Sequence, residues 1–294
     1  MLTKVRRNPA ALAWGLLLLL GLIWGSSFIL IKQGLTAFSA AEVGALRIAS
    51  ASVFLVPVAL PALHSLSRRH LTLLAFIGLF GSLGPAFLFA FAQTQLSSSV
   101  TGILNAVTPL NVLLLGAAFF GRSITRPELV GLGAGLVGTV ILMLAGSSGS
   151  LGGINYYALL IIAATICYGF NTNIIKNYLG DLKPTVITAV SLLLAGPAAV
   201  FYLLSVPGFA EKAVSGAARW PLLAMVLLGV VGTALALIMF NKLVQIRTAV
   251  FASSVTYLVP MVAIGWGVLD GESLSVWHLV GMGAILGGVY VANR

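Results

Sequence analysis

The sequence predicts an all-α integral membrane protein with ten transmembrane helices, arranged as two inverted repeats of five. Three observations predict this fold: the chain is 60% hydrophobic and 7% charged, its basic residues gather on one side of ten apolar stretches, and its second half repeats patterns of its first. A soluble domain usually has about 25% charged residues, so a soluble fold could not hide this much apolar surface. We therefore expect the lipid bilayer to surround the chain.

The spans follow from length, because a helix needs about 20 apolar residues to cross roughly 30 Å of hydrocarbon. Ten stretches qualify, and the fifth and tenth are the shortest. They are residues 11–31, 43–63, 71–92, 100–120, 129–146, 156–175, 185–206, 220–240, 249–269 and 276–292. The longest loop between them, residues 207–219, leaves no room for an extramembrane domain. Any binding site must therefore lie among the helices.

The orientation follows from the Lys and Arg residues, since basic loops stay in the cytoplasm. Of the 16 Lys and Arg residues, twelve fall on the amino-terminal side of the spans, three fall on the opposite side, and Arg47 lies within a span. Both termini are therefore predicted to be cytoplasmic. This bias also accounts for the net charge of +10 without nucleic acid as a partner. We expect a monomer in the cell membrane, which is the inner membrane if the source is bacterial.

An internal repeat divides the chain into residues 1–146 and 147–294. Residues 129–138 and 279–288 are identical at seven of ten positions. Other matches at nearby offsets join Gly78, Gly81, Ser82 and Pro109 to Gly229, Gly232, Thr233 and Pro260, and Trp24, Ser27 and Lys32 to Tyr168, Asn171 and Lys176. Five helices per repeat is an odd number, so the second copy enters the membrane from the opposite side. Inverted repeats favour alternating access around a midplane site, although duplication could also have made only a longer bundle.

Short motifs add a family resemblance that covers nearly the whole chain. They are Trp24-Gly25-Ser26-Ser27-Phe28 followed by Lys32, then Arg47, Pro109, Pro260 and Gly271-Glu272-Ser273-Leu274. In this order the chain resembles the drug/metabolite transporter (DMT) superfamily, and within it the EamA-type ten-helix permeases. The resemblance implies transport of small organic molecules, as in bacterial amino-acid and metabolite exporters. One departure is Gly121-Arg122-Ser123-Ile124, where the family often has glutamate at the position of Arg122.

Polar residues within the spans point to a shared cavity, because buried polar groups in lipid must face other helices or water. Asn105 and Thr108 share one helical face, Asn105 corresponds to Thr256, and Ser27 corresponds to Asn171. Hydrogen bonding between helices is the alternative for each of them. The predicted substrate pathway, aromatic candidates included, consists of Trp24, Ser27, Phe87, Phe91, Asn105, Thr108, Tyr168, Asn171, Thr256 and Tyr257.

Arg47 could extend to the membrane surface or contact a substrate carboxylate. Pro85, Pro109 and Pro260 remove backbone donors within spans, so they could kink the helices and free carbonyl groups, or only shape the packing. All six acidic residues are expected in loops, which disfavours a proton-coupled exporter of cationic drugs.

No phosphate-binding loop, metal-ligand spacing or recognisable nucleophile with a base is present in the sequence. We therefore predict no cofactor, no metal and no enzyme activity. The leading hypothesis is a secondary transporter, a uniporter or exchanger, that exports amino acids or similar small metabolites by alternating access. The alternatives are a broad-specificity multidrug exporter and, from another class, a membrane-embedded enzyme or lipid-handling protein.

Overall fold

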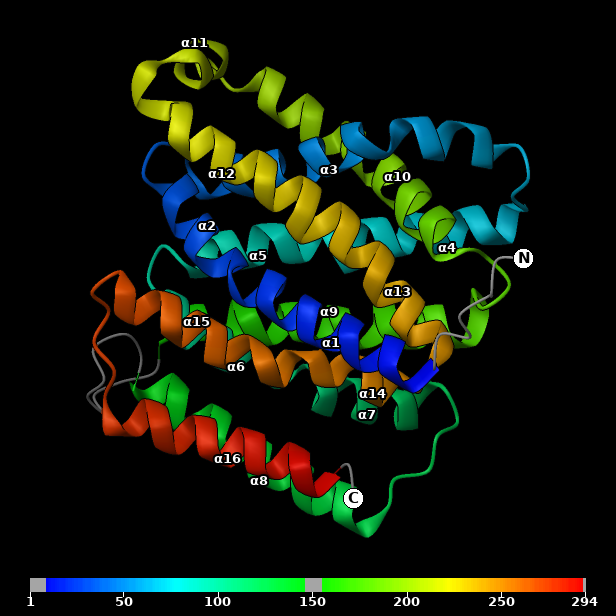
Figure 1. Cartoon of the computed structure of the whole chain (residues 1–294), viewed down its shortest axis with the longest axis vertical. Coiled ribbons are helices and arrows are strands. Elements are labelled where there is room, and N and C mark those ends of the chain that lie inside the picture. The colour runs from blue at the N-terminus through cyan, green and yellow to red at the C-terminus, as the bar shows by residue number, and fades with distance from the viewer. Residues whose placement is uncertain (1–8, 146–154, 293–294) are drawn as a thin grey trace, which may run out of the picture.

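Figure 1 shows a computed structural model that describes residues 9–145 and 155–292. Every regular element in these two ranges is a helix. The first range holds α1 (Pro9–Gly25), α2 (Ser27–Leu35), α3 (Ala40–Leu63), α4 (Arg68–Gly78), the π-helix η1 (Leu79–Leu83), α5 (Gly84–Ala92), α6 (Ser98–Asn105), α7 (Thr108–Phe119) and α8 (Arg126–Ala145). The second holds α9 (Tyr157–Tyr178), α10 (Pro184–Ser205), α11 (Phe209–Val214), the 3₁₀-helix η2 (Gly216–Ala218), α12 (Arg219–Gly229), the π-helix η3 (Val230–Leu235), α13 (Ala236–Ile246), α14 (Ala249–Ser253), the 3₁₀-helix η4 (Ser254–Tyr257), α15 (Leu258–Leu269) and α16 (Val276–Ala292). The predicted boundary between residues 146 and 147 lies outside the described ranges.

Eight helical stretches in these ranges are long and apolar enough to cross a membrane. They are Ala10–Leu35, Ala40–Leu63, Arg68–Ala92, Ser98–Phe119, Tyr157–Tyr178, Pro184–Ser205, Gly216–Ile246 and Ala249–Leu269. They cover eight of the ten predicted spans. The fifth and tenth predicted spans correspond to α8 and α16, which are helical but are not among the eight. The fold is therefore all-helical and of the membrane class.

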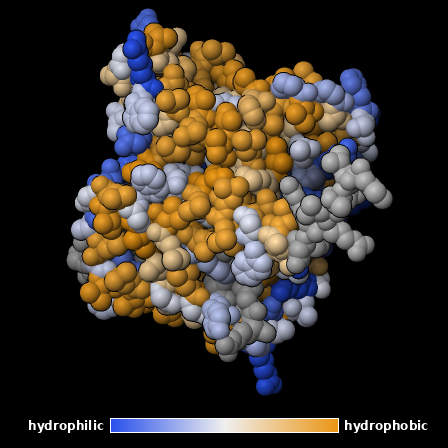
Figure 2. Space-filling view, viewed as in Figure 1, coloured by the Kyte–Doolittle hydropathy of each residue, from blue (hydrophilic) through white to orange (hydrophobic). Residues whose placement is uncertain are grey.

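The outer surface of the helices is apolar. Figure 2 shows hydrophobic residues over most of one face, with hydrophilic residues gathered toward its edges. Many large apolar side chains are exposed, among them Leu204 at 80% and Phe201 at 73%. Soluble monomers rarely expose contiguous apolar patches larger than a few hundred Å². This surface therefore suits contact with lipid tails.

Several spans begin about one turn before the hydropathy pattern predicts, because serine residues cap them. Ser39, Ser67 and Ser97 precede α3, α4 and α6, and each side chain accepts a hydrogen bond from the backbone N–H three residues later. Such caps satisfy donors that a helix leaves free at its start. Hydropathy marks the hydrocarbon core, whereas these caps extend the helices into the polar interface.

Five of the predicted spans depart from a regular α-helix within the bundle. The first breaks at Ser26 between α1 and α2, and the fourth breaks between α6 and α7. The third and eighth contain the π-helices η1 and η3, and the ninth passes through η4 before α15. The sequence predicts all five of these spans as continuous stretches.

The three predicted proline sites account for part of this irregularity. Pro85, Pro109 and Pro260 lie in the first turn of α5, α7 and α15, each directly after an interruption. Proline has no N–H, so the carbonyl four residues earlier receives no helical hydrogen bond from it. Those earlier residues are Gly81, Asn105 and Thr256. All three line one internal cavity.

The glycine-rich faces of α8 and α16 pack against each other, and Figure 1 shows the two helices side by side along one edge of the molecule. A Cβ atom built at Gly138 would lie 2.6 Å from the carbonyl oxygen of Gly281, and one at Gly288 would lie 2.5 Å from that of Gly131. Small residues let the two backbones approach this closely. These glycines therefore serve helix packing.

Candidate functional site

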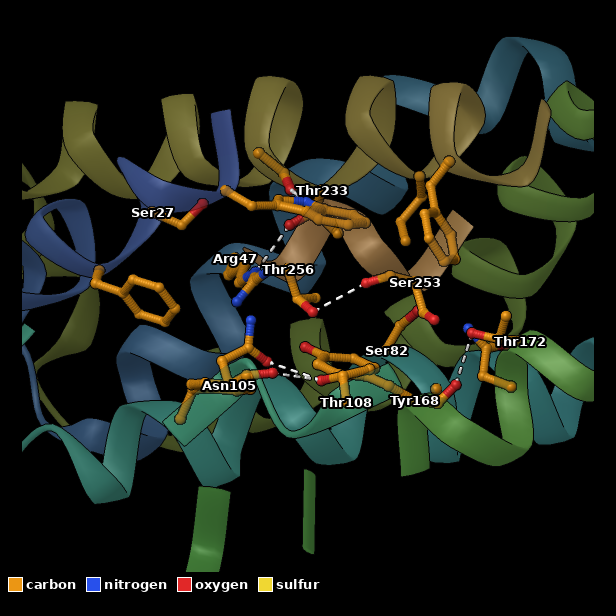
Figure 3. A pocket seen from close by; sticks show the side chains of 18 of the residues that line it. Ser27, Arg47, Ser82, Asn105, Thr108, Tyr168, Thr172, Thr233, Ser253 and Thr256 are labelled. Carbon is orange, nitrogen blue, oxygen red and sulfur yellow. Dashed lines mark hydrogen bonds between the residues drawn. The ribbon is translucent and has the colours of Figure 1, made fainter. Parts of the chain in front are cut away.

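A cavity of about 80 Å³ lies among the interrupted helices (Figure 3). One water needs roughly 10–15 Å³ of such a cavity volume, so the cavity in this conformation has room for several waters or a small molecule. Its walls come from α1, α2, α3, η1, α5, α6, α7, α9, η3, α13, α14 and η4. The lining residues are Trp24, Ser27, Phe28, Ile31, Arg47, Gly81, Ser82, Phe89, Asn105, Thr108, Tyr168, Asn171, Thr172, Gly232, Thr233, Leu237, Phe240, Ser253 and Thr256.

Most of the predicted pathway residues meet at this cavity. Those that line it are Trp24, Ser27, Asn105, Thr108, Tyr168, Asn171 and Thr256, and Arg47, the predicted carboxylate contact, lines it as well. Three aromatic candidates do not line it. Phe91 is 43% exposed on the outside, Phe87 packs edge-on against Tyr202, and Tyr257 is half-buried in η4. The structure therefore brings the polar candidates together and separates these three aromatic residues from them.

Arg47 projects from α3 toward the cavity instead of toward the membrane surface. Its Nε atom donates a hydrogen bond to Oγ1 of Thr233 at 2.8 Å, and Thr233 donates in turn to the carbonyl oxygen of Leu228. No ion pair of Arg47 occurs within the described ranges. Arg47 is also the one Lys, Arg, Asp or Glu residue among the lining residues. The cavity therefore carries one positive charge that no neighbouring acid neutralises.

Neutral polar groups surround this charge. The hydroxyl of Thr108 donates to the carbonyl oxygen of Asn105, and the indole of Trp24 donates to the carbonyl oxygen of Gly232 in η3. Asn171 is 5% exposed, and its buried side-chain oxygen has no hydrogen-bond partner among the described residues. A buried acceptor without a partner costs free energy, so this amide is available to a polar ligand.

Aromatic rings form the other part of the wall. Trp24 contacts Phe240 with ring centroids 5.2 Å apart, and Phe89 lies between Phe28 and Tyr168 with centroids 5.8 and 6.1 Å away. Phe28, Phe89 and Phe240 were not predicted site residues. Phe28 ends the motif that begins at Trp24, but nothing in the sequence separates Phe89 and Phe240 from the many phenylalanines that pack or face lipid. Ser82 and Thr233, by contrast, could have been found, because they occupy matching positions of the internal repeat.

Acidic side chains stay at the ends of the helices, although not all lie in loops as expected. Glu42 is in the first turn of α3 and pairs with Lys212, while Glu128 is in the first turn of α8 and pairs with Arg122. Within the described ranges no group of three or more potential metal ligands occurs. The chemistry of this site is therefore that of one guanidinium group among hydroxyls, amides and aromatic rings.

Proteins of similar sequence have names that describe transporters. The chain is 26% identical over 276 residues to "Uncharacterized inner membrane transporter YedA" of Escherichia coli, which covers 93% of this chain and 88% of that protein. It is 26% identical to the "Probable terminal-alkyne amino-acid exporter" of Streptantibioticus cattleyicolor, over 96% of this chain and 93% of that one. The "Probable amino-acid metabolite efflux pump" of Salmonella typhimurium is also 26% identical, over 94% and 93%.

A solved crystal structure shares the fold with a TM-score of 0.65 at 19% identity, covering 95% of this chain and 96% of that one. The model of the EamA-like transporter family matches the chain twice, at residues 12–144 and 155–294. Together these matches cover most of the sequence, and they agree with the multi-pass helical architecture described above. The chain belongs to the EamA-like transporter family and is a multi-pass membrane transporter.

Proposed function

We propose that this transporter exports small amino acids or similarly small metabolites from the cytoplasm, as a uniporter or exchanger. The observation that carries the proposal is the single unpaired guanidinium group of Arg47 in a small, otherwise neutral cavity. A planar guanidinium suits a carboxylate, which it can bind through two parallel hydrogen bonds. The names of two relatives, an amino-acid exporter and an amino-acid metabolite efflux pump, point to the same class of cargo.

The neutral polar groups suit the other end of such a molecule. The carboxylate of an amino acid would pair with Arg47, which leaves its ammonium group to be bound by neutral hydrogen-bond acceptors. The amide of Asn171 and the hydroxyls of Thr256 and Ser82 provide acceptors around the cavity. The absence of an acid from the lining residues disfavours cargo with net positive charge.

The proposed mechanism is alternating access by a monomer with ten spans, two inverted halves and both termini in the cytoplasm. Paired features of the two halves support this proposal. The π-helices η1 and η3 begin 151 residues apart. A Cβ atom at Gly81 in η1 would lie 2.7 Å from the side chain of Asn171, and one at Gly232 in η3 would lie 3.3 Å from Ser27. Ser27 and Asn171 are themselves matched by the repeat.

A broad multidrug exporter is the second candidate, because Trp24, Phe28, Phe89, Tyr168 and Phe240 give the cavity aromatic walls. Such walls can accept varied apolar groups. Against this candidate stand the small volume of the cavity and its positive charge, since many drugs are large cations. Competition by apolar cations against amino-acid flux would favour it over the first proposal.

Flux into proteoliposomes reconstituted with the purified protein tests the proposal. The probes are labelled serine, alanine and threonine, with lactate and alaninamide as matched molecules that lack the amine or the carboxylate charge. We expect flux of at least one amino acid, and little flux of alaninamide. Arg47→Gln should lower the rate at subsaturating substrate about tenfold or more, as expected for lost charge-assisted hydrogen bonds.

Arg69→Gln is the matched control. Arg69 lies over the ring of Tyr178, 5.7 Å from its centroid, and does not line the cavity. Its rate should stay close to that of the parent protein. Equal losses in both variants, or flux of alaninamide as fast as that of alanine, would remove Arg47 from the role of carboxylate partner.

A further inference from the structure

A cluster of charges ties three elements together beyond one end of the cavity. Lys32 of α2 forms ion pairs with Asp270 and with Glu272, whose carboxylate is 3.2 Å from Nζ of Lys32. Both acids belong to the turn that links α15 to α16. Lys32 is adjacent to Ile31, which lines the cavity. The cluster therefore lies directly outside the cavity wall.

Glu272 also holds the start of α6. Its carboxylate accepts hydrogen bonds from the backbone N–H groups of Ser98 and Ser99 at 2.9 and 3.0 Å, and from the hydroxyl of Ser99 at 2.7 Å. Charge-assisted bonds of this kind are stronger than neutral ones. With Lys32 included, this one carboxylate joins α2 and α6 through the α15–α16 turn.

A second set of bonds closes the same end. Gln93 donates through Nε2 to the carbonyl oxygen of Phe28 at 2.9 Å, and the hydroxyl of Ser98 lies 3.4 Å from the same oxygen. Phe28 lines the cavity and Ser98 is fully buried. Phe28 in the cavity wall is therefore hydrogen-bonded to Ser98, whose backbone N–H donates to Glu272.

The positions that correspond to this cluster in the other half surround a pocket instead. By the repeat, Lys32 corresponds to Lys176, Asp270 and Glu272 to Phe120 and Arg122, and Ser98 and Ser99 to Ala249 and Val250. All five of these counterparts line a second pocket, of about 500 Å³. The turns themselves match, since Gly121 and Gly271 both have positive φ, 69° and 81°.

The chemical reason for the difference lies at position 122. Arginine there cannot pair with Lys176, and it pairs with Glu128 at 2.6 Å. Lys176 donates instead to the carbonyl oxygens of Val244 and Arg247. At one end the carboxylate of Glu272 therefore joins distant elements of the chain. At the opposite end the carboxylate of Glu128 accepts only from Arg122 and the backbone N–H of Thr125 among the described residues, both within six residues of it, and it ties no distant element.

From this difference we infer that Lys32, Asp270, Glu272, Ser98 and Ser99 form a latch that closes one end of the transport pathway. Glu272 is its positioning residue and touches no substrate. The pocket at Lys176 and Arg122 is the opposite entrance in its open state. The inference rests on the proposed alternating access, but it does not depend on the identity of the cargo.

Accessibility of a cavity cysteine from each side of the membrane tests the latch in the full-length protein. The parent carries Cys167→Ser and Ser27→Cys, and a small membrane-impermeant thiosulfonate is added to either face of sealed vesicles. A separate Thr36→Cys variant, at an exposed position just after α2, identifies the face that carries Lys32. We expect Glu272→Gln to speed labelling from the Lys32 face about tenfold, the factor for one charge-assisted hydrogen bond.

The matched control is Glu42→Gln. Glu42 is also a buried carboxylate that pairs with a lysine and caps a helix, but its partners Lys212 and Ser39 do not bridge the cavity. Its labelling rate should stay within about twofold of the parent, since it removes no contact of the latch. If Glu272→Gln does not fold, Lys32→Gln breaks the same tie and leaves the cap on α6 intact.

Two outcomes would overturn the latch. One is unchanged labelling from the Lys32 face in both Glu272→Gln and Lys32→Gln. The other is faster labelling from both faces, which indicates general loosening of the bundle. Absence of amino-acid flux in the unsubstituted protein, together with the expected labelling response, would count against the proposed cargo and in favour of the latch.

Discussion

Arg47 and Thr233 are joined by a 2.8 Å hydrogen bond between positions that lie 186 residues apart in the sequence. Thr233 belongs to the π-helix η3, and its own hydroxyl donates to Leu228, five residues earlier. An α-helix would point this side chain in another direction, because backbone hydrogen bonds span five residues in a π-helix and four in an α-helix. The orientation of the one charge in the cavity therefore depends on an irregular turn of another span.

The first prediction concerns that contact. Thr233→Val keeps the shape of the side chain and removes the acceptor for Nε of Arg47. A hydrogen bond to a charged group contributes about 1.5–3 kcal/mol, so the substrate concentration at half-maximal flux should rise roughly tenfold or more. Flux in proteoliposomes measures this. Thr188→Val is the control, because Thr188 accepts from Asn241 away from the cavity. An equal effect in both variants would contradict the role of Thr233.

The second prediction separates two buried asparagines whose side-chain oxygens both lack partners. Asn171 lines the cavity, and the structure gives its amide no hydrogen bond that folding would lose. Asn241 does not line it and donates to Thr188 at 2.9 Å. Asn171→Ala should therefore reduce flux with little change in thermal stability. Asn105→Ala should also reduce flux, and it loses in addition a 3.3 Å hydrogen bond from the hydroxyl of Thr108. Asn241→Ala should lose about 1 kcal/mol of stability. Flux and melting temperature of each purified variant measure these effects, and normal flux in both cavity variants would move the site elsewhere.

The fold could be predicted from sequence to the level of its spans. Apolar length predicted the approximate limits of the eight stretches that are long and apolar enough to cross a membrane, because the thickness of the hydrocarbon core sets the length of a spanning helix. It could not predict the π-helices η1 and η3. Pro85 follows η1, but alanine, Ala236, stands at the matching position after η3, so no proline marks the second irregular turn. The backbones of two helices approach closely just before η3, since a Cβ atom at Gly229 would lie 2.7 Å from the carbonyl oxygen of Arg47 in α3.

The site could be predicted where polarity was the signal. Asn105, Asn171 and Thr256 stand out in apolar spans because lipid makes them costly. Aromatic residues give no such signal, which is why Phe91 was a candidate although it faces outward, while Phe89 was not. The role of Glu272 was also beyond the sequence. Its partners Ser98 and Ser99 lie more than 170 residues away, and only the folded chain brings them together.

The third prediction is a pH dependence of stability from Glu272. Burial raises the pKa of its carboxyl group, but hydrogen bonds from Ser99, Ser98 and Lys32 outweigh this and hold the pKa below its ordinary value. In the unfolded chain the pKa is about 4.3. The carboxylate therefore stabilises the fold above that pH, and the contribution is lost as pH falls through the lower folded value.

Melting temperatures from about pH 3 to pH 7 for the parent and for Glu272→Gln test this linkage. The parent should be more stable at neutral pH, and the difference should shrink below about pH 4.3. A difference that stays constant down to the lowest pH would show that the charge of Glu272 contributes nothing.

The fourth prediction uses two glycines of α15. A Cβ atom at Gly267 would overlap the hydroxyl of Ser99 and the carboxylate of Glu272, whereas one at Gly265 would meet no atom within 4 Å. Gly267→Ala should therefore displace Glu272 and speed cysteine labelling from the Lys32 face, as Glu272→Gln does. Gly265→Ala should label like the parent and keep its stability. If Gly267→Ala leaves the labelling rate unchanged, the bonds of Glu272 do not control access.

The fifth prediction introduces a counterpart of Glu272 at the opposite end. Arg122→Glu places a carboxylate at the position that corresponds to Glu272, beside Lys176 at the position that corresponds to Lys32. Within the described ranges Lys176 donates to the backbone carbonyl oxygens of Val244 and Arg247 and forms no ion pair, so an ion pair with the new carboxylate is open to it. We expect the pocket to close in a larger share of molecules, and labelling of the cavity cysteine from the Lys176 face to slow severalfold.

Arg122→Gln is the control for that experiment, because it also breaks the pair with Glu128 but adds no carboxylate. Its labelling from the Lys176 face should match that of the parent. A transporter held closed at both ends cannot complete its cycle, so Arg122→Glu should also slow flux, and adding Lys32→Gln should restore part of it by freeing the other end. Equal labelling of Arg122→Glu and Arg122→Gln would mean that a carboxylate at this turn does not close the entrance.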